Sequence, residues 1–503
     1  MRLSEIRQHL PAAELRGDGA VDVSAAEFDS RDAGHGAIFV AVPGLNVDGH
    51  DFLARAVAAG ASAVCVQRDH EQKWRDFDGR LPILIVDDTR AALATIAAAL
   101  HDFPARKLNV IGVTGTDGKT SLSYLLAHVL QTAGERTGLI STAECRIGDE
   151  IIGDSGRFTT PEAPEVQSML ATMVQHRCRW AVVEATSHGL ALHRLDQVEP
   201  DIAVVTNVSA DHLDFHGSVE NYLAAKGRLF EMLDEAAPKG ELAKTAILNA
   251  DDPSYAYFRE RTNGRIVTYG IDSEADFRAD KIRPTDWGSD FKVKHPGGEL
   301  RLGITSPGVF NVSNALAALT VSAVAGVDLN EAAGAIKYWP GAPGRMQRID
   351  EGQPFTVVVD FAHAPDSLRR VLSLLRSRTP GRLIALFGCI GERERERRSG
   401  MGRAAAELAD FTIVTDDNPY TEDRDAILAE IADALRAAGK EEGADFAVIP
   451  DRRDALAHAL RIAQPNDAVL LAGKGHETKV VLADTSYDCN DAELARQLLR
   501  DRH

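Results

Sequence analysis

The last third of the chain alternates short apolar runs with amphipathic segments, and this alternation restricts the fold most strongly. The apolar runs are TVVVDFA (356–362), RLIALFGCI (382–390), FTIVTDD (411–417), DFAVIP (445–450) and AVLLAGKG (468–475). Segments with helical spacing, such as DSLRRVLSLLRS and DAILAEIADALRAAG, separate these runs. Strands that are apolar on both faces and alternate with helices are typical of a doubly wound parallel sheet. We therefore predict an α/β fold with such a sheet in the C-terminal part of the chain.

Two stretches rich in proline or polar residues predict the joints between domains. HDFPARKLN (101–109) ends an alanine-rich helical pattern, and YWPGAPGRMQ (338–347) alternates proline with glycine. Further strand-like runs lie between these joints (KLNVIGVTG, RWAVVEA, IAVVTNV and KTAILNAD) and before the first joint (GAIFVAV and GASAVCVQ). The sequence predicts three domains, at residues 1–104, 105–342 and 343–503.

Composition argues against partners that are large polyanions or membranes. The 503 residues include 56 basic and 75 acidic side chains, and the net charge of −19 repels nucleic acid and anionic headgroups. Charged residues interrupt every apolar run before membrane-spanning length, and the N-terminus lacks the apolar segment of a secretory signal. The five cysteines lack the pair spacing of metal or redox sites. We expect a cytoplasmic protein with no nucleic-acid partner and no membrane insertion.

The segment GVTGTDGKTS (112–121) predicts a phosphate-binding loop of unusual spacing. It joins the strand-like run NVIGV to a helical pattern, and Val113 occupies the position of the first glycine of the commonest P-loop. Backbone N–H groups and the positive end of a helix dipole favour bound phosphate in such a loop. Lys119 adds a cation, and the Thr120 hydroxyl suits Mg²⁺. We predict that residues 114–120 bind a triphosphate.

Polar residues after two other strand-like runs belong to the same predicted site. Glu184 follows the run RWAVV, and Asp211 and His212 follow IAVVTNV. The carboxyl ends of parallel strands meet at one edge of a sheet, where ligands bind. A carboxylate and an imidazole beside a triphosphate suit Mg²⁺, which neutralises the charge that develops during phosphoryl transfer. Composition alone indicates that Lys226 is a solvated helix lysine and that Asn249 and Asn311 are helix caps.

Together these motifs resemble the Mur ligase family. Its loop has the form T-G-T-N-G-K-T, and this chain has TGTDGKT, with Asp117 at the asparagine position. The segments DSRDAGHGAIFVAVPG, FTTPEAPEVQ, EATSHGLALHRLD, TNVSADHLDFHG, LNADDP, FNVSNALAA, PGRMQRID, VVDFAHAPDS, DDNPYTED and GKGHE follow in the order found in Mur ligases that add the third peptide residue. The resemblance covers nearly the whole chain. It implies a uridine-nucleotide domain, a central P-loop-like ATPase domain and a C-terminal domain that receives the amino acid.

The resemblance also implies roles for individual residues. The implied ATP contacts are Gly115, Thr116, Asp117, Gly118, Lys119, Thr120, Ser121, Asn249 and Asn311. The implied contacts of the UDP-MurNAc-dipeptide are Ser30, Thr159, Thr160, Thr186 and Arg194, with the loop 44–50. The implied amino-acid contacts are Arg393, Asp417, Asn418, Pro419, Tyr420, Gly473 and Glu477. The implied Mg²⁺ ligands are Thr120, Glu184, His212 and a carbamylated Lys226, and the implied catalytic residues are Lys119, Lys226, His212 and Glu184.

The implied reaction is the ATP-dependent addition of a diamino acid to UDP-MurNAc-L-Ala-D-Glu through an acyl phosphate, by a monomeric enzyme. Tyr420 replaces the arginine of the D-N-P-R motif of diaminopimelate-adding ligases, whereas GKGHE (473–477) is typical of that group. The context of Arg393, GER, resembles that of lysine-adding ligases. Diaminopimelate, L-lysine and L-ornithine therefore all remain open as the added amino acid.

Other functions also remain open at this stage. A Mur-ligase paralogue in secondary metabolism would join an amino acid to another carboxylate, and a folylpolyglutamate synthetase would lack a counterpart of the N-terminal domain. A non-catalytic binding protein would be expected to lose Lys119, Glu184 or His212. His363 and Asp360 are candidates for the base that deprotonates the amine, alongside structural or ATP-contacting roles.

Overall fold

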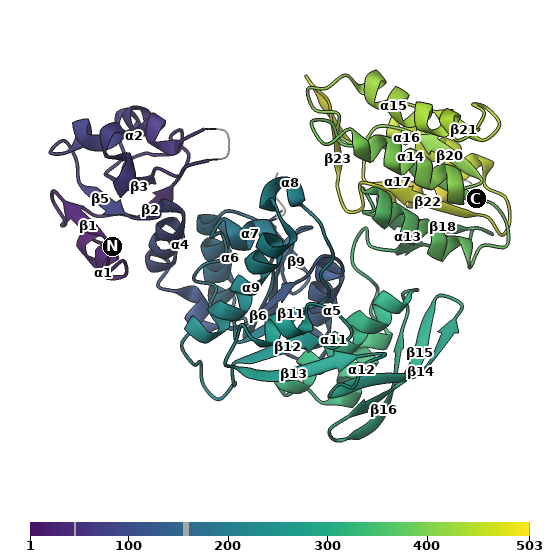
Figure 1. Cartoon of the computed structure of the whole chain (residues 1–503), viewed down its shortest axis with the longest axis horizontal. Helices are drawn as coiled ribbons and strands as arrows, with labels where there is room; N and C mark the ends of the chain where they lie inside the picture. The colour runs from purple at the N-terminus through teal and green to yellow at the C-terminus, as the bar shows by residue number, and fades with distance from the viewer. Residues whose placement is uncertain (45–46, 154–159, 502–503) are drawn as a thin grey trace. The chain divides into compact units, whose positions relative to one another are not determined.

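The computed structural model describes residues 1–44, 47–153 and 160–501, which divide into two compact units. The first unit comprises residues 1–285, 289–304 and 309–339, and the second comprises residues 286–288, 305–308 and 340–503. Figure 1 shows the helices and strands of both units. The predicted domain boundaries at 104 and 342 stay a prediction.

A small, mostly parallel sheet forms the N-terminal part of the first unit. Its strand order is β1-β5-β4-β3-β2, with only β1 antiparallel to its neighbour. Two apolar clusters pack against this sheet, and β3, β4 and β5 are therefore buried along nearly their whole length. The elements are β1 (Glu14–Arg16), β2 (Ala25–Glu27), β3 (Ala37–Val40), β4 (Ala63–Gln67) and β5 (Ile83–Val86), with helices α1 (Leu3–Gln8), α2 (Leu53–Ala59), α3 (Glu71–Trp74) and α4 (Thr89–Leu100).

An eleven-stranded sheet of order β16-β15-β14-β13-β12-β11-β6-β10-β7-β8-β9 forms the rest of the first unit. Its strands from β7 to β14 in this order are parallel, and antiparallel pairs β7–β8, β8–β9 and β15–β16 extend the edges. The strands are β6 (Asn109–Thr114), β7 (Thr137–Ile140), β8 (Cys145–Ile147), β9 (Glu150–Gly153), β10 (Trp180–Glu184), β11 (Ile202–Val205), β12 (Thr245–Asn249), β13 (Arg265–Gly270), β14 (Phe277–Thr285), β15 (Gly288–His295) and β16 (Gly298–Ile304). The helices are α5 (Lys119–Thr132), α6 (Ala163–Gln175), α7 (Ser187–Ala191), α8 (Leu213–His216), α9 (Val219–Glu235), α10 (Tyr255–Arg259), α11 (Val309–Ala325) and α12 (Leu329–Lys337).

The second unit confirms the doubly wound sheet predicted from the alternating pattern. Its order is β17-β18-β22-β19-β20-β21, with only β17 antiparallel. One apolar core joins this sheet to α13, α14 and α15, and a second core joins it to α16 and α17. The strands are β17 (Gln347–Ile349), β18 (Thr356–Asp360), β19 (Leu383–Phe387), β20 (Phe411–Val414), β21 (Phe446–Val448) and β22 (Ala468–Ala472), with a separate hairpin of β23 (Lys479–Val481) and β24 (Ser486–Asp488). The helices are α13 (Pro365–Arg376), α14 (Glu396–Leu408), α15 (Arg424–Ala437), α16 (Arg452–Ile462) and α17 (Asp491–Arg500).

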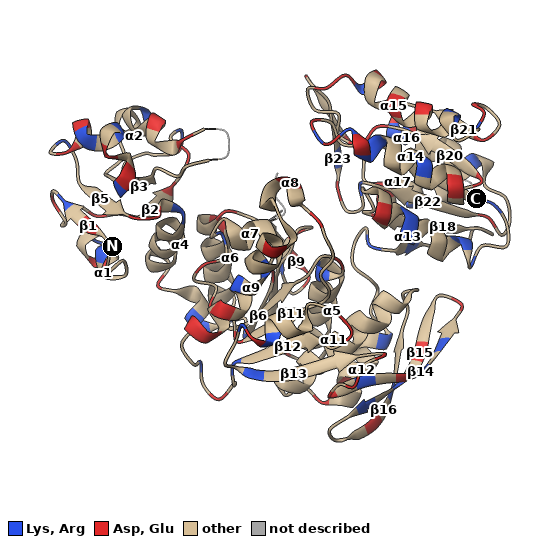
Figure 2. Cartoon of the chain, in the orientation of Figure 1, with Lys and Arg blue, Asp and Glu red and all other residues tan. Residues whose placement is uncertain are grey.

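Charged residues of both signs are interspersed along the ribbon of each unit (Figure 2). Among the helices of the described residues, none combines the length and the apolarity that crossing a lipid bilayer requires.

Candidate active site

The glycine-rich loop follows β6 at the carboxyl edge of the eleven-stranded sheet. Its glycines occupy positions where a side chain has no room. Gly115 has a φ of +142°, and a Cβ there would lie 1.9 Å from Thr206 Oγ1. Gly118 has a φ of +84°, and a Cβ there would lie 2.8 Å from Asn314 Oδ1. Glycine is therefore required at positions 115 and 118 by the side chains of Thr206 and Asn314, and this explains the unusual glycine spacing of the loop.

Residues after β11 hold the loop in place. The Asn207 carbonyl accepts from Thr116 N–H at 2.7 Å, and Asn207 Oδ1 accepts from Asp117 N–H at 3.1 Å. The Asp117 carbonyl accepts from Thr206 Oγ1 at 2.7 Å and from Asn207 Nδ2 at 3.0 Å. The backbone on both sides of Asp117 is thus fixed from outside the loop. Thr206 and Asn207 were not predicted as site residues, although they lie near the end of the predicted strand-like run IAVVTNV.

Two lysine side chains converge on the loop carbonyls. Lys119 Nζ donates to Gly115 O at 3.1 Å and to Thr116 O at 2.8 Å, and Lys226 Nζ donates to Gly115 O at 2.6 Å. Lys226 is only 1% exposed, so the interpretation of this residue as a solvated helix lysine is wrong. Burial, with the nearby Lys119 charge, lowers the pKa of Lys226 well below its ordinary value. The amine lies 4.3 Å from the centre of the Tyr222 ring.

The predicted pair Thr120 and Glu184 lies together beneath the loop. Thr120 Oγ1 donates to Glu184 Oε1 at 3.0 Å, and the backbone N–H of Thr142 donates to Glu184 Oε2 at 3.0 Å. The carboxylate is 3% exposed and is oriented by both contacts. Thr142, which follows β7, was not predicted. The group presents hydroxyl and carboxylate oxygens, which are the ligand types that Mg²⁺ prefers.

His212 belongs to a cluster of aromatic side chains at the start of α8. Its ring lies 4.7 Å from that of His188, which in turn lies 4.2 Å from Phe215 and 5.4 Å from His216. Burial lowers the pKa of His212, and burial with the two neighbouring histidines lowers the pKa of His188 to about 4. The imidazoles are therefore neutral at neutral pH, which is the form that ligates a metal ion.

The other residues that the resemblance assigns to ATP lie on α5, at the end of β12 and on α11. Asn249 is buried, donates from Nδ2 to Thr206 O at 2.7 Å and accepts from Asp251 N–H at 3.0 Å. Asn311 is the third residue of α11 and is buried, whereas Ser121 on α5 is half-buried. Their contacts with ATP stay a prediction.

Three of the residues that the resemblance assigns to the muramoyl-peptide form a second group: Thr186 and Arg194, which follow β10, and Thr160, which precedes α6. The Thr160 and Thr186 hydroxyls hydrogen-bond at 2.6 Å, and Arg194 Nη1 donates to Thr160 O at 3.0 Å. Arg194 also pairs with Glu162 at 2.7 Å. Ser30 is buried in the N-terminal part of the first unit, and Thr159 lies outside the described residues.

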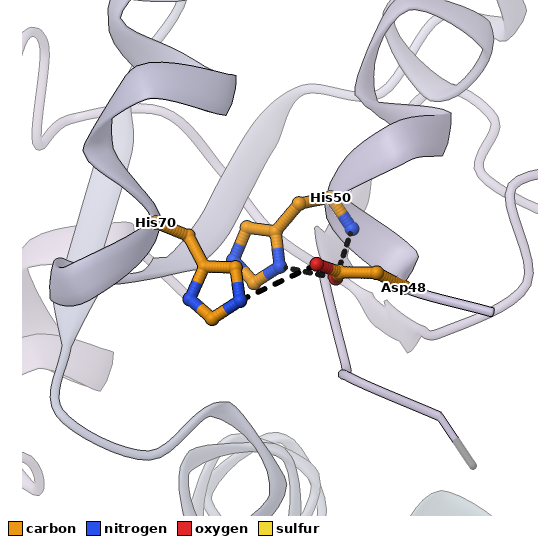
Figure 3. A group of neighbouring side chains, drawn as sticks. All are labelled: Asp48, His50 and His70. Carbon is orange, nitrogen blue, oxygen red and sulfur yellow. Dashed lines mark hydrogen bonds and ion pairs between the residues drawn. The ribbon is translucent and has the colours of Figure 1, made fainter. Parts of the chain in front are cut away.

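Within the described residues, Asp48, His50 and His70 place potential metal ligands within 4.8 Å of one another (Figure 3). His50 Nε2, however, accepts from Gln67 N–H at 2.9 Å, so Nδ1 carries the proton and donates to Asp48 Oδ1 at 2.7 Å. Lys73 Nζ already occupies Asp48 Oδ2 at 2.7 Å. The protonated Nδ1 of His50 and the Lys73 ammonium disfavour binding of a metal cation here. The hydrogen bonds of this group instead tie the 47–50 segment to Gln67 and Lys73.

The second unit brings the ends of β20 and β22 together around Lys474. Its fully buried Nζ donates to Glu477 Oε2 at 2.6 Å and to Asn418 Oδ1 at 3.1 Å, and Asn418 Nδ2 donates to Glu477 Oε2 at 2.8 Å. Asp417 is 1% exposed, and neither of its carboxyl oxygens has a hydrogen-bond partner among the described residues. Lys474 Nζ lies 3.5 Å from Asp417 Oδ1, and burial raises the pKa of Asp417.

The remaining predicted amino-acid contacts surround this cluster. Gly473 has a φ of +99°, and a Cβ there would lie 3.0 Å from Asp417 Oδ2. The Pro419 carbonyl packs against Gly391, and Arg393 on the following loop is exposed. Tyr420 has a φ of +53° and donates its N–H to Val481 O at 3.1 Å.

The two candidates for the base have contacts of their own in the second unit. Asp360 accepts from Met346 N–H at 2.7 Å and from Ala362 N–H at 2.9 Å. His363 Nδ1 lies 2.9 Å from Phe361 O, and burial lowers the pKa of this histidine. The contacts of Asp360 are those of a structural residue that holds the chain near Met346.

Comparison with known proteins matches the whole chain to one family. Three family models match: "Mur ligase family, catalytic domain" over residues 23–101, "Mur ligase middle domain" over 113–322 and "Mur ligase, glutamate ligase domain" over 344–475. A UDP-N-acetylmuramyl-tripeptide synthetase of Roseiflexus sp. is 42% identical over 100% of this chain and 99% of its own length. A UDP-N-acetylmuramoyl-L-alanyl-D-glutamate–2,6-diaminopimelate ligase of Streptomyces coelicolor is 39% identical over 99% of this chain and 96% of its own. A solved structure of a ligase with the latter name is 30% identical, covers 100% of this chain and 99% of its own, and has a TM-score of 0.67.

Proposed function

The chain belongs to the Mur ligase family, and we propose that it adds a diamino acid to UDP-MurNAc-L-Ala-D-Glu in peptidoglycan precursor synthesis. It is an ATP-dependent ligase that forms an amide bond. The observation that carries the proposal is the grouping at one sheet edge of the loop with Lys119, the Thr120–Glu184 pair and the Thr160–Thr186–Arg194 group. We further propose that the enzyme is monomeric and cytoplasmic.

Amide synthesis from a carboxylate needs activation because a carboxylate is a poor electrophile. Phosphorylation of the peptide's carboxylate by ATP gives an acyl phosphate, and attack by a neutral amine expels phosphate. The loop amides and Lys119 supply the donors and the positive charge that stabilise a transferring phosphoryl group. Asn207 and Thr206 hold the backbone of the loop in its shape through hydrogen bonds on both sides of Asp117.

Thr120, Glu184 and His212 fit the Mg²⁺ site that the family implies. The Thr120 hydroxyl and the Glu184 carboxylate are hydrogen-bonded to each other, and His212 is half-buried and neutral at neutral pH. A bound Mg²⁺ would neutralise charge on the phosphates. The backbone N–H of Thr142 donates to the other carboxylate oxygen of Glu184 and so fixes the orientation of this proposed ligand.

Lys226 is the residue that we propose to be carbamylated. An amine attacks CO₂ only in its neutral form, forming an N–C bond and releasing a proton, and burial favours the neutral form of Lys226. The product, a carbamate, is an anion, and the Lys119 charge near Lys226 would stabilise it. In the unmodified protein, the Lys226 amine donates to Gly115 O. Native mass measurement of the intact protein with and without bicarbonate tests the modification, and Lys226→Arg is the matched control because it cannot form the carbamate.

The second unit supports a diamino acid whose far end carries an ammonium group. Among the described residues, the carboxyl groups of Asp417 and Glu477 both pair with the Lys474 ammonium, and two carboxyl groups beside one ammonium favour a cationic group of the substrate. Tyr420 lacks the guanidinium that would pair with a distal carboxylate. We propose that L-lysine or L-ornithine is preferred over diaminopimelate, the substrate in the names of most of the relatives compared.

Phosphate release tests the proposed function. Purified protein is incubated with ATP, Mg²⁺, UDP-MurNAc-L-Ala-D-Glu and each of the three diamino acids, with L-alanine as the control. We expect release only with a diamino acid and only when the nucleotide substrate is present. Release with none of them would refute the peptidoglycan assignment and would favour a paralogue acting on another carboxylate.

A further inference from the structure

Arg452 is a fully buried cation in a position that does not favour one. It is the first residue of α16, where a positive charge opposes the helix dipole, and it has no exposed surface. Its Nε and Nη2 donate to Asp491 Oδ1 and Oδ2 at 2.8 and 2.6 Å. Asp491 is the first residue of α17 and is equally buried. Removing such a pair from water is costly, so helix stability does not explain its presence.

The rest of the guanidinium contacts two backbone carbonyls at the carboxyl edge of the sheet. Nη1 donates to Asp416 O at 3.0 Å, and Nη2 donates to Ala472 O at 2.9 Å. Asp416 directly precedes the segment Asp417–Tyr420, and Ala472 directly precedes Gly473–Glu477. Arg452 therefore holds the last carbonyl before each of the two loops that carry the proposed amino-acid contacts.

These two loops do not come from neighbouring strands, since β19 lies between β20 and β22. They meet above the end of β19 because that strand is followed by Gly388, where a Cβ would lie 2.2 Å from Thr415 O and 2.6 Å from Asp417 N. Sheet hydrogen bonding between β20 and β22 is therefore impossible. The Arg452 guanidinium supplies one direct link between the loops, and the Lys474–Asn418–Glu477 contacts supply another.

We propose that Arg452, oriented by Asp491, is a positioning residue for the amino-acid site: it sets the spacing of the 416–420 and 472–477 loops without touching the substrate. The inference rests on the proposed function, which assigns the amino acid to these loops. A planar guanidinium with both carboxylate oxygens on one side presents its remaining donors in fixed directions. A lysine ammonium has one nitrogen and cannot hold Asp491 and both carbonyls in the same geometry.

The test compares Arg452→Lys with Arg382→Lys. Arg382 also pairs with a buried carboxylate, Asp467, at 3.0 Å, and donates to a backbone carbonyl, that of Ile462, at 2.7 Å. It lies at the opposite edge of the same sheet, immediately before β19, whereas Asp467 immediately precedes β22. Both variants lose an Arg–Asp pair at the same sheet, but Arg382 is 41% exposed whereas Arg452 is fully buried, and only the Arg452 pair links the two loops. Asp491→Asn, which keeps the shape of the partner, is the second variant should Arg452→Lys fail to fold.

Initial rates are measured while the diamino acid, ATP and the UDP-MurNAc-dipeptide are varied in turn. For Arg452→Lys we expect the KM for the diamino acid to rise at least about tenfold, because shifts of about 1 Å in a site have effects of this size or larger. The KM values for ATP and for the nucleotide substrate stay within about twofold of wild type. Asp491→Asn shows the same pattern more weakly, and Arg382→Lys changes none of the three KM values.

An unchanged KM for the diamino acid in both Arg452→Lys and Asp491→Asn would overturn the inference. An equal rise of all three KM values would also overturn it, because the effect would then not be confined to the amino-acid site. Failure of the proposed function has a different signature, in which wild-type protein releases no phosphate with any diamino acid.

Discussion

Replacing Lys226 by methionine keeps the aliphatic part of the side chain and removes the buried amine. Keeping an ordinary lysine neutral at pH 7.5 costs about 4 kcal/mol, from a reference pKa near 10.4 and about 1.4 kcal/mol per pH unit. The hydrogen bond to Gly115 O is worth about 1 kcal/mol. Gly115 O still accepts from Lys119 when this bond is lost, so the carbonyl is not left without a partner. We expect Lys226→Met to be more stable than wild type by up to about 3 kcal/mol at pH 7.5.

The sign of the pH dependence follows from the lowered pKa of Lys226. Because burial lowers the pKa of Lys226, the folded chain binds fewer protons at this group than the unfolded chain does, so wild-type stability rises with pH until the unfolded lysine titrates near pH 10.4. The advantage of the methionine variant therefore disappears at pH 10.5. Urea unfolding is carried out in bicarbonate-free buffer at both pH values. Hydrogen exchange of the β6 segment serves as the probe, so the measured stability is that of this sheet alone. Phosphate release at pH 7.5 should fall at least about 100-fold, the effect of losing one strong electrostatic group in an active site.

Two results would refute this reasoning. A methionine variant that is less stable than wild type at pH 7.5 would show that the amine is a net stabilising group. A variant with undiminished phosphate release would show that the amine has no part in the reaction. Lys226→Ala supplies the complementary test, because the carbamate account expects a short-chain carboxylic acid to restore part of its activity.

Three further predictions concern other parts of the account. Gly115→Ala should reduce phosphate release at least about 100-fold and weaken ADP binding in calorimetry, because its Cβ would lie 1.9 Å from Thr206 Oγ1 at a φ of +142°; normal ADP affinity would contradict the described loop. Tyr420→Arg should raise the kcat/KM for diaminopimelate relative to L-lysine about tenfold or more, since a guanidinium then faces the distal carboxylate; an unchanged ratio would remove Tyr420 from the specificity site. Because the pKa of His188 is lowered to about 4, the first unit should lose stability as pH falls from about 6.5 to 4, and His188→Gln should flatten this loss in urea unfolding; identical profiles would show that His188 is not the group responsible.

The sequence predicts the elements that depend on local pattern. The five strands β18 to β22 of the second unit begin within one residue of their apolar runs, and β6, the loop and α5 have the order expected around Lys119, whereas β17, β23 and β24 were not predicted. Thr120 and Glu184 were predicted to meet because each follows a buried strand of one parallel sheet, and their side chains are hydrogen-bonded. In each case the spacing of apolar residues, or the topology of a parallel sheet, was enough.

Contacts between segments that are distant in the sequence could not be predicted from local patterns. Lys226 has the appearance of a surface lysine until its helix face is known to pack on the loop. Asn207 lies 90 residues from Asp117 along the chain, and Thr142 lies 42 from Glu184. Arg452 and Asp491 each resemble an exposed charge at a helix start, and only the packing of α16 beside α17 buries both. The antiparallel edges β8–β9 and β15–β16 likewise lack the fully apolar runs by which the central strands were found.

The account depends most directly on the loop at residues 114–120, and Lys119→Ala tests it. Formation of the amide product from UDP-MurNAc-L-Ala-D-Glu and the preferred diamino acid is followed by mass spectrometry, with circular dichroism to confirm that the variant is folded. The account predicts a fall of about 100- to 1,000-fold in product formation, with ADP and phosphate falling in parallel. Product formation at the wild-type rate by the folded variant would contradict it.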